Sequence, residues 1–410
     1  MTDKNSAKER TAIKRTGNNR KKEPEQAERN SSLCPVSKLC GGCQYLDMPY
    51  ERQLKLKQQQ MQKLLGSFCK VYPIAGMENP FHYRNKVHAV FGWKKGEVVS
   101  GVYQENTHNL IPVERCMIED EKSDEIIGTI RNMLKSFKIR TYDEDSGYGL
   151  LRHVLIRRGF ATNEIMVVLI TASPVFPSKN HFVQALRKAH PEITTIVQNI
   201  NGRGTSMVLG EKEHILYGKG AIEDILCGCR FRISSRSFYQ VNPVQAEKLY
   251  DKAVELAGLT GKEVVLDAYC GIGTIGIIAA RKAKQVIGVE LNRDAVRDAI
   301  QNAKGNRISN IRFYCNDATR FMSQMAKDGA EADVVLMDPP RAGSTEEFIR
   351  AVKAVRAKRV VYVSCGPETL ARDLKVFGKL GYQACGVWVY DMFPAVRHVE
   401  VACCLQRKDS

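Results

Sequence analysis

The stretch LDAYCGIGTIG, residues 266–276, begins inside an apolar run (VVLDA, 264–268) and is rich in glycine. Gly271, Gly273 and Gly276 match the spacing of the dinucleotide-binding fingerprint, but alone this match indicates only a tight turn after a strand. Asp267 lies inside the turn, where its carboxylate would repel a pyrophosphate and would suit the cationic amino group of an amino acid. The stretch therefore predicts a strand and turn that bind a ligand without phosphates.

Apolar runs that alternate with helical patterns follow this stretch along the chain. We predict strands at 264–268, 285–290, 311–315, 333–338, 359–364 and 398–405, with helices between them, for example at 294–303 and 345–355. Continuous apolar strands separated by amphipathic helices are typical of a mostly parallel sheet that is covered on both faces. The fold class is therefore α/β, and a ligand is expected at the carboxyl ends of the strands.

Polar residues follow the second and third strands, where that ligand would bind. Glu290 ends the second strand, 23 residues after Asp267, and is placed to accept hydrogen bonds from ribose hydroxyls. Asn316 and Asp317 follow the third strand, at the height of an adenine amino group. A ribose, an adenine and an amino acid moiety without phosphates together describe S-adenosylmethionine, which is the expected cofactor.

The fourth and fifth strands end in residues that suit group transfer. DPPR (338–341) follows the fourth strand, and its prolines make Asp338 a rigid, partly desolvated carboxylate. SCGP (364–367) ends the fifth strand and places Cys365 at the rim of the cofactor cleft, near a helix N-terminus that would favour its thiolate. We expect the nearby Arg341 to raise the thiolate fraction further. Cys365 is therefore predicted to be catalytic.

The last predicted strand contains two polar side chains among apolar ones. His398 and Glu400 are two residues apart, so they share a face of that strand. A carboxylate on an apolar strand is costly unless it is paired or used. Glu400 is therefore a candidate general base, and His398 is interpreted as a structural hydrogen-bonding partner.

Four cysteines in the N-terminal third have the spacing of ligands. Cys34, Cys40 and Cys43 form a compact triplet, and Cys116 follows 73 residues later. The N-terminus has no secretory signal, so the compartment is expected to be the reducing cytoplasm, and the thirteen cysteines are not read as disulfides. Four thiolates can hold either zinc or an iron–sulfur cluster, and the spacing does not choose between them.

The charge balance points to nucleic acid. The chain has 62 Lys and Arg against 45 Asp and Glu, a net charge of +17, and such a field attracts polyanions. There is no apolar run of 18 residues, so no membrane span is expected. Basic residues gather in the middle of the chain, beside a hairpin predicted from runs at 153–158 and 164–171, and these are candidate RNA contacts: Arg84, Lys86, Arg152, Arg157 and Arg158.

Composition divides the chain into four segments. Residues 1–30 are a basic tail with almost no large apolar residue, which predicts disorder. Residues 31–75 contain the cysteine triplet and a helix at 51–65, and residues 76–235 have mainly strand and turn patterns. Residues 236–410 form the cofactor-binding domain.

Several motifs together resemble the RNA uridine-C5 methyltransferases, the family that makes 5-methyluridine in 23S rRNA and tRNA. The matching segments are SFYQVNP (237–243), LDAYCGIGTIG, DPPR, YVSCGP (362–367) and HVEVA (398–402), and FHYRNKV (81–87) and LLRHVLIRRG (150–159) also look similar. The resemblance runs from Cys34 to the C-terminus. Two features depart from the family pattern: Gly366 replaces the usual Asn after the cysteine, and the polar residues before Cys34 cannot form the N-terminal β-barrel that many members have.

The resemblance implies a fold and residue roles. The fold would be a class I, Rossmann-like methyltransferase domain with a seven-stranded, mostly parallel sheet, together with a β-rich central domain and an N-terminal cysteine cluster. Cys365 would be the nucleophile and Glu400 the base, and S-adenosylmethionine would contact Gln240, Tyr269, Glu290 and Asp338. The resemblance favours a 4Fe-4S cluster on Cys34, Cys40, Cys43 and Cys116. The substrate would be 23S rRNA, bound by a monomer.

Other functions remain open from the sequence alone. A tRNA uridine-C5 methyltransferase uses the same motifs. An amino-group RNA methyltransferase is a further alternative, because a strand-end Asp-Pro-Pro can orient an exocyclic amine without any cysteine. A non-catalytic iron–sulfur RNA-binding protein and a nicotinamide dehydrogenase are the remaining alternatives, and Asp267 disfavours the last.

Overall fold

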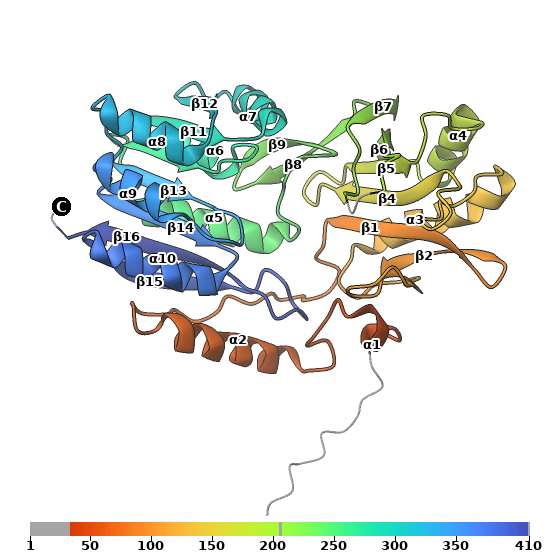
Figure 1. Cartoon of the computed structure of the whole chain (residues 1–410), viewed down its shortest axis with the longest axis horizontal. Coiled ribbons are helices and arrows are strands. Elements are labelled where there is room, and N and C mark those ends of the chain that lie inside the picture. Colours follow the sequence, from red (N-terminus) through yellow and green to blue (C-terminus); the bar gives the residue numbers. More distant parts are fainter. Residues whose placement is uncertain (1–32, 205–206, 409–410) are drawn as a thin grey trace, which may run out of the picture.

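The computed structural model describes residues 33–204 and 207–408. Figure 1 shows two sheets side by side, with a small hairpin between them and helix α2 beneath the C-terminal sheet. The basic tail predicted at 1–30 lies outside the described residues. No helix within the described ranges is long and apolar enough to cross a membrane.

The C-terminal sheet has seven strands in the order β12-β11-β10-β13-β14-β16-β15. The first five are parallel, and β16 pairs antiparallel with both β14 and β15. The strands are β10 (Val264–Ala268), β11 (Gln285–Glu290), β12 (Ile311–Cys315), β13 (Val334–Met337), β14 (Arg359–Ser364), β15 (Tyr382–Tyr390) and β16 (Glu400–Arg407). The predicted α/β fold with a seven-stranded, mostly parallel sheet is confirmed.

Six helices connect and cover these strands, as the alternating pattern predicts. They are α5 (Pro243–Ala257), α6 (Thr274–Ala280), α7 (Arg293–Gly305), α8 (Ala318–Lys327), α9 (Glu346–Ala354) and α10 (Pro367–Lys379). Asn292, Asp317 and Thr345 cap the N-termini of α7, α8 and α9 with side-chain oxygens. The apolar strands are buried between two helical layers, which explains why five predicted strands agree with the structure within one residue.

Two details of this sheet differ from the prediction. The strand β15 was not predicted, because its apolar residues are interrupted by Cys385 and Gly386 at a bulge. The last strand begins at Glu400, not at 398, so His398 precedes the strand and does not share a strand face with Glu400.

The central sheet also has seven strands, in the order β3-β2-β1-β4-β5-β6-β7. Helices α3 (Glu121–Ser136) and α4 (Lys179–Ala189) pack on one face of it. The predicted hairpin is present as β4 and β5, and Asn163 in its turn has a left-handed backbone. The strands are β1 (Lys86–Lys94), β2 (Glu97–Tyr103), β3 (Leu110–Pro112), β4 (Leu151–Arg158), β5 (Ile165–Thr171), β6 (Ile193–Ile200) and β7 (Lys212–Tyr217).

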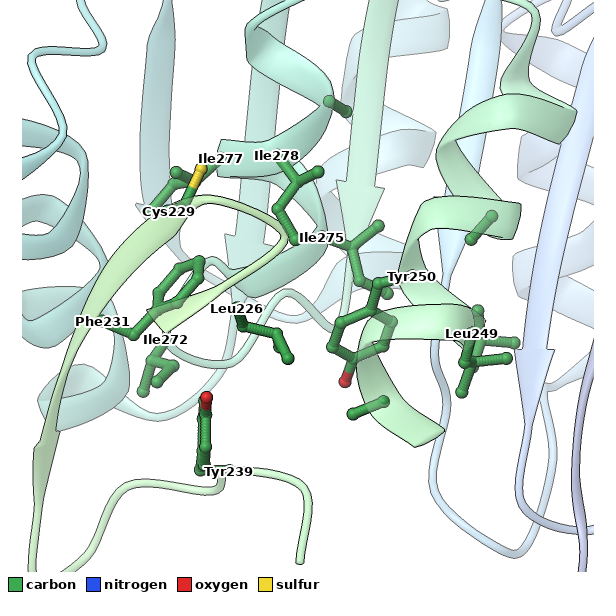
Figure 2. Close-up of a cluster of buried hydrophobic side chains, with 14 of the residues drawn as sticks. Leu226, Cys229, Phe231, Tyr239, Leu249, Tyr250, Ile272, Ile275, Ile277 and Ile278 are labelled. Carbon is green, nitrogen blue, oxygen red and sulfur yellow. The ribbon is translucent and has the colours of Figure 1, made fainter. Parts of the chain in front are cut away.

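One hydrophobic core joins the two sheets. It includes the hairpin β8 (Ala221–Leu226) and β9 (Cys229–Ser234), central-sheet residues such as Leu155 and Met166, and residues of α5 and α6. In Figure 2, Leu226 and Phe231 of the hairpin lie near Ile272 in the cofactor turn, with Tyr239 and Tyr250 beside them. Because apolar contacts continue from one sheet to the other, the core stabilises the relative position of the two sheets and of the space between them.

The N-terminal segment connects both halves. Helix α1 (Ser37–Cys40) lies in the cysteine-rich stretch, and α2 (Tyr50–Leu65) packs against α10 and β15. The following residues run beside β15, with bridges from Val71 to Val387 and from Ala75 to Tyr390. The helix predicted at 51–65 is thus confirmed.

Candidate active site

The turn after β10 is organised around a buried carboxyl group. Asp267 Oδ2 accepts the backbone N–H of Gly276 at 2.8 Å, and a Cβ at Gly276 would lie 2.5 Å from the same oxygen. Glycine is therefore required for this contact. Burial, together with Asp338 and Glu290, raises the pKa of Asp267 to about 8. Three carboxyl groups from neighbouring strand ends thus lie close enough to repel one another when ionised. An anionic pyrophosphate would add to this repulsion, so it is a disfavoured ligand.

Backbone N–H groups hold the carboxylates at the ends of the next two strands, β11 and β12. Glu290 accepts the N–H of Gly271 through Oε2 at 3.1 Å and the N–H of Asn292 through Oε1 at 2.8 Å. Asp317 accepts the N–H of Arg320 at 2.9 Å and so caps α8. Both side chains are oriented before any ligand binds, because local backbone contacts hold them.

Tyr269 lies in the turn between these groups. Its backbone has a φ of +63°, in the left-handed region, which is unusual for a residue with a side chain. Its ring packs against Phe348 of α9, with 5.3 Å between the ring centroids. The turn therefore directs an aromatic side chain toward α9 beside the carboxyl ends of the strands.

A cavity of about 550 Å³ lies where the central sheet meets the C-terminal sheet. The predicted catalytic residues line it together, although 35 positions separate Cys365 from Glu400. Gln240 Nε2 donates a hydrogen bond to Glu400 Oε2 at 3.3 Å. The polar side chains that line the cavity from residues 236–410 are Gln240, Arg341, Cys365, His398 and Glu400.

Burial and a neighbouring acid dominate the electrostatics of this cavity. Burial raises the pKa of Glu400 to about 8, and Asp338 adds to the rise, while the hydrogen bond from Gln240 and the charge of Arg341 oppose it. Burial also raises the pKa of Asp338, to about 7. Because the charge of Asp338 contributes to the pKa of both Asp267 and Glu400, Asp338 lies near both carboxyl groups. A carboxyl group that titrates near neutral pH suits a general base.

The pKa of the Cys365 thiol is higher than the sequence predicts. Burial, Glu400 and Asp338 raise its pKa, and the opposing charge of Arg341 does not compensate for them. The predicted electropositive environment of the thiol was therefore wrong. The structural reason is burial of the thiol, together with Glu400, which is far from Cys365 in the sequence but lines the same cavity.

The four cysteines predicted as ligands line the same cavity. Cys34, Cys40 and Cys43 come from the N-terminal segment, and Cys116 precedes α3. Burial and the neighbouring thiols Cys40 and Cys34 raise the pKa of Cys43 to about 11. Across residues 33–204 and 207–408, no three His, Cys, Asp or Glu side chains are grouped closely enough to hold a metal ion. The thiols are brought together in one region, but not in ligand geometry.

Two of the basic residues predicted to bind RNA are structural instead. Arg152 is buried, pairs with Glu144 at 2.7 Å, and donates to backbone carbonyls of the 201–203 segment. Arg157 is also buried and donates to the carbonyl oxygens of Ser235 and Ser237. These predictions were wrong, because charge in the sequence does not show which cations satisfy buried carbonyls.

Comparison with known proteins decides the family. The model of the tRNA (uracil-5-)-methyltransferase family matches residues 49–408. The chain belongs to this family. It is therefore an S-adenosylmethionine-dependent RNA (uracil-C5-)methyltransferase, as the motifs predicted, and an amino-group methyltransferase, a dehydrogenase or a non-catalytic binding protein is disfavoured.

Curated relatives and a solved structure agree with this family assignment. An uncharacterized RNA methyltransferase of Halalkalibacterium halodurans is 43% identical over 387 residues, 93% of this chain and 84% of the relative. One of Caldanaerobacter subterraneus is 42% identical over 92% of this chain and 85% of its own length. The tRNA (uracil-54, C5)-methyltransferase of Pyrococcus abyssi, solved with S-adenosyl-L-homocysteine, has a TM-score of 0.75 and 27% identity, with 90% of this chain and 86% of that chain covered.

The cavity is also lined by residues that were not predicted from the sequence. Phe238 is 67% exposed and lines the cavity two residues before Gln240. Phe393 and Val396 line it from the segment before β16. An exposed aromatic ring beside a nucleophile is suited to stack on a base. The position of Phe238 two residues before the predicted cofactor residue Gln240 was the available signal.

Proposed function

We propose that this enzyme methylates C5 of a specific uridine in 23S rRNA through a covalent bond between Cys365 Sγ and C6 of the uracil. The observation that supports this is the shared cavity of Cys365, Glu400 and Gln240 beside the carboxyl ends of the parallel strands. Uracil C5 is a poor nucleophile, so the reaction needs a group that activates it and a base that restores the ring.

The residues of the cavity divide the chemistry between them. Cys365 adds to C6, which gives C5 the electron pair that takes the methyl group. Glu400 then removes the C5 proton, the C5–C6 double bond forms again, and the bond between Sγ and C6 breaks. Gln240 donates to Glu400 and orients it for this step. In folded RNA the uridine must leave its stack to reach the cavity, at a cost of a few kcal/mol.

S-adenosylmethionine supplies the methyl group on a sulfonium when it is bound. The chain's residues fit it, because the strand ends offer oriented carboxyl groups, which suit hydroxyl and amino groups better than a phosphate. We propose that Glu290 holds the ribose, that Asp317 lies at the adenine, and that Gln240, Tyr269 and Asp338 contact the remainder of the cofactor.

A tRNA uridine is the second candidate substrate. The similarity to the tRNA (uracil-54, C5)-methyltransferase of Pyrococcus abyssi favours it. The test is to map 5-methyluridine in 23S rRNA and tRNA from a deletion strain and to restore it with the purified protein. Loss confined to 23S rRNA supports the proposal, and loss confined to tRNA contradicts it.

We further propose that Cys34, Cys40, Cys43 and Cys116 hold a 4Fe-4S cluster with a structural role. These thiols line one wall of the cavity, and three of them pack against an apolar cluster of Leu46, Tyr83, Ile118 and Ala395. A bound cluster would connect the N-terminal segment to the central sheet and would stabilise thiolates that burial disfavours.

Anaerobically purified protein is expected to be brown and to contain about four irons per chain. Cys40→Ser and Cys43→Ser should lose the colour and the iron, because each removes a ligand. Cys315→Ser is the matched control, since Cys315 is exposed at the end of β12 and should keep both. Metal analysis and visible absorption measure this, and one zinc per colourless chain would contradict the cluster.

We propose that Arg84 and Lys86 contact RNA phosphates. Arg84 lines the cavity, and Lys86 starts β1 directly opposite Arg157. Burial and the charges of Arg157 and Arg84 lower the pKa of Lys86 to about 8. A phosphate near these cations would relieve their repulsion, so they suit an RNA strand entering the cavity.

Lys86→Ala should weaken RNA binding and reduce its salt dependence by about one phosphate contact, or roughly 0.7 in the logarithmic slope on single strands. Lys358→Ala is the control, because Lys358 directly precedes β14 at the amino ends of the parallel strands, away from the cavity, and pairs with Asp333. RNA affinity measured against salt concentration tests this. Equal losses in the two variants would contradict a phosphate contact at Lys86.

We also propose that the enzyme acts in the cytoplasm as a monomer. One chain contributes Cys365, Glu400 and the strand-end carboxylates, so a second copy is not needed to complete the cavity. Light scattering of the purified protein tests the oligomeric state, and a stable dimer would contradict the proposal.

A further inference from the structure

The segment between β15 and β16, residues 391–399, is held by other parts of the chain at each of its first five carbonyls. We call it the 391–399 loop. The donors come from four separate segments, and none of these bonds belongs to a helix or sheet. They are Gln245 Nε2 to Asp391 O (3.1 Å), Asn242 Nδ2 to Met392 O (3.1 Å), Lys57 Nζ to Phe393 O (3.0 Å), Tyr83 Oη to Pro394 O (3.1 Å) and Tyr45 N to Ala395 O (2.9 Å).

A buried ion pair joins this loop to α2. Lys57 Nζ contacts Asp391 Oδ1, and neither side chain is exposed to solvent. Tyr50, about two helical turns before Lys57 on α2, donates through Oη to Asp391 Oδ2 at 2.8 Å. A buried pair of this kind contributes little net stability once desolvation is counted, but it strongly disfavours other arrangements of the groups around it. The main effect of the pair is therefore to fix the position of the 391–399 loop against α2.

The loop contains one residue that needs such support. Ala395 has a φ of +64°, a left-handed conformation that alanine rarely adopts. Its N–H is accepted by Gln53 Oε1 at 2.9 Å, and its carbonyl accepts the N–H of Tyr45. Strained residues of this kind persist where the surroundings determine them and are concentrated at functional sites.

The loop ends at the proposed base. Phe393, Val396 and His398 line the catalytic cavity, and Glu400 follows as the first residue of β16. The position of Glu400 therefore depends on the path of the loop, and the path depends on α2 and on the cysteine-rich segment before it. We propose that the N-terminal segment positions Glu400 through the 391–399 loop, and that Gln53 and Lys57 are positioning residues for removal of the C5 proton.

This positioning role rests on the proposed covalent mechanism, and it concerns only the elimination step. Addition of Cys365 to C6 and methyl transfer do not need Glu400. Elimination does: the C5–H bond breaks, its electron pair forms the C5–C6 double bond, the bond from Sγ to C6 breaks, and the proton passes to Glu400. A displaced base should therefore trap methylated RNA on Cys365, whereas a general loss of stability should not.

Two glutamines on α2 provide a matched experiment. Gln53 binds the loop at Ala395, whereas Gln58, five residues later, accepts the N–H of Ile74 at 2.7 Å and donates to Tyr72 O at 3.4 Å. Gln53→Leu and Gln58→Leu each remove two side-chain hydrogen bonds from the same helix, but only the first removes a contact with the loop. Thermal unfolding of both variants measures their loss of stability.

We expect Gln53→Leu to methylate bound RNA at a nearly normal rate in one turnover and to release it roughly tenfold to a hundredfold more slowly, with a denaturant-resistant RNA–protein adduct. Gln58→Leu should turn over like the wild type. The double variant Lys57→Met with Asp391→Asn, which removes both buried charges together, should show the same adduct. Equal slowing in the two glutamine variants, or slow methyl transfer without an adduct, would overturn the proposal.

Failure of the covalent mechanism is distinguishable from failure of this proposal. RNA with 5-fluorouridine at the target position should be trapped by the wild type and by Gln53→Leu alike, since the base cannot remove fluorine as a proton. A wild type that forms no adduct with this RNA contradicts the covalent mechanism. Trapping by both proteins, together with normal product release from Gln53→Leu, contradicts only the positioning role.

Discussion

The Cys365→Ala and Cys365→Ser variants are expected to form no detectable 5-methyluridine, a loss of roughly 10⁴-fold or more, as for other enzymes that lose their nucleophile. Without a sulfur at C6, uracil C5 has no electron pair to accept the methyl group. Serine does not rescue the reaction, because a hydroxyl is a weak nucleophile unless an adjacent base activates it. Burial and the neighbouring groups Glu400 and Asp338 raise the pKa of Cys365 and so already disfavour the thiolate.

Cofactor binding separates this result from misfolding. Cys365 lines the cavity and does not contribute to the turn around Asp267, so both variants should bind S-adenosyl-L-homocysteine with nearly normal affinity in calorimetry. Cys385→Ser is the matched control, because Cys385 is exposed at the bulge of β15. It should turn over normally. Substantial turnover by Cys365→Ala would rule out the covalent mechanism.

The parts of the fold that local sequence determines were predicted well. Strands such as 264–268 and 285–290 are short, apolar and buried on both faces, so their pattern is the same in the sequence and in the structure. Strand β15 was missed because its burial pattern is irregular around Cys385 and Gly386. The carboxyl ends of parallel strands also meet on one side of the sheet whatever the details of packing, which is why the sequence could place Glu290 and Asp317 at neighbouring strand ends.

The cavity itself depends on contacts that the sequence does not contain. Arg157 and Lys86 are both basic strand residues in the printed sequence, yet one satisfies the buried carbonyls of Ser235 and Ser237 and the other does not. Lys57 and Asp391 are 334 positions apart and form a buried pair. Only the packing of α2 against the C-terminal sheet brings them together, and local patterns in a single sequence cannot report it.

Glu400→Gln is expected to stop the reaction after methyl transfer, so that methylated RNA remains bonded to Cys365. Glutamine has the shape of glutamate and can still accept the hydrogen bond from Gln240, but it cannot take up the C5 proton. Where Glu400 is ionised, its charge raises the pKa of Cys365, so the substitution does not hinder formation of the attacking thiolate. Addition should therefore proceed, and product release should fall by roughly 10²-fold to 10⁴-fold, the usual contribution of a general base.

The pH dependence of product release tests the assignment of the base. Burial raises the pKa of Glu400 to about 8, so below this pH the carboxyl group is mostly protonated and cannot act as a base. In the wild type, breakdown of the adduct should become faster as the pH rises through about 8, and in Glu400→Gln this rise should be absent. Asp338 and Cys365 also titrate beside Glu400, but Cys365 acts in formation of the adduct, so rapid-quench measurement of formation and breakdown separates their contributions. If Glu400→Gln releases methylated RNA rapidly and keeps the rise with pH, another group removes the proton, and Asp338 becomes the candidate base.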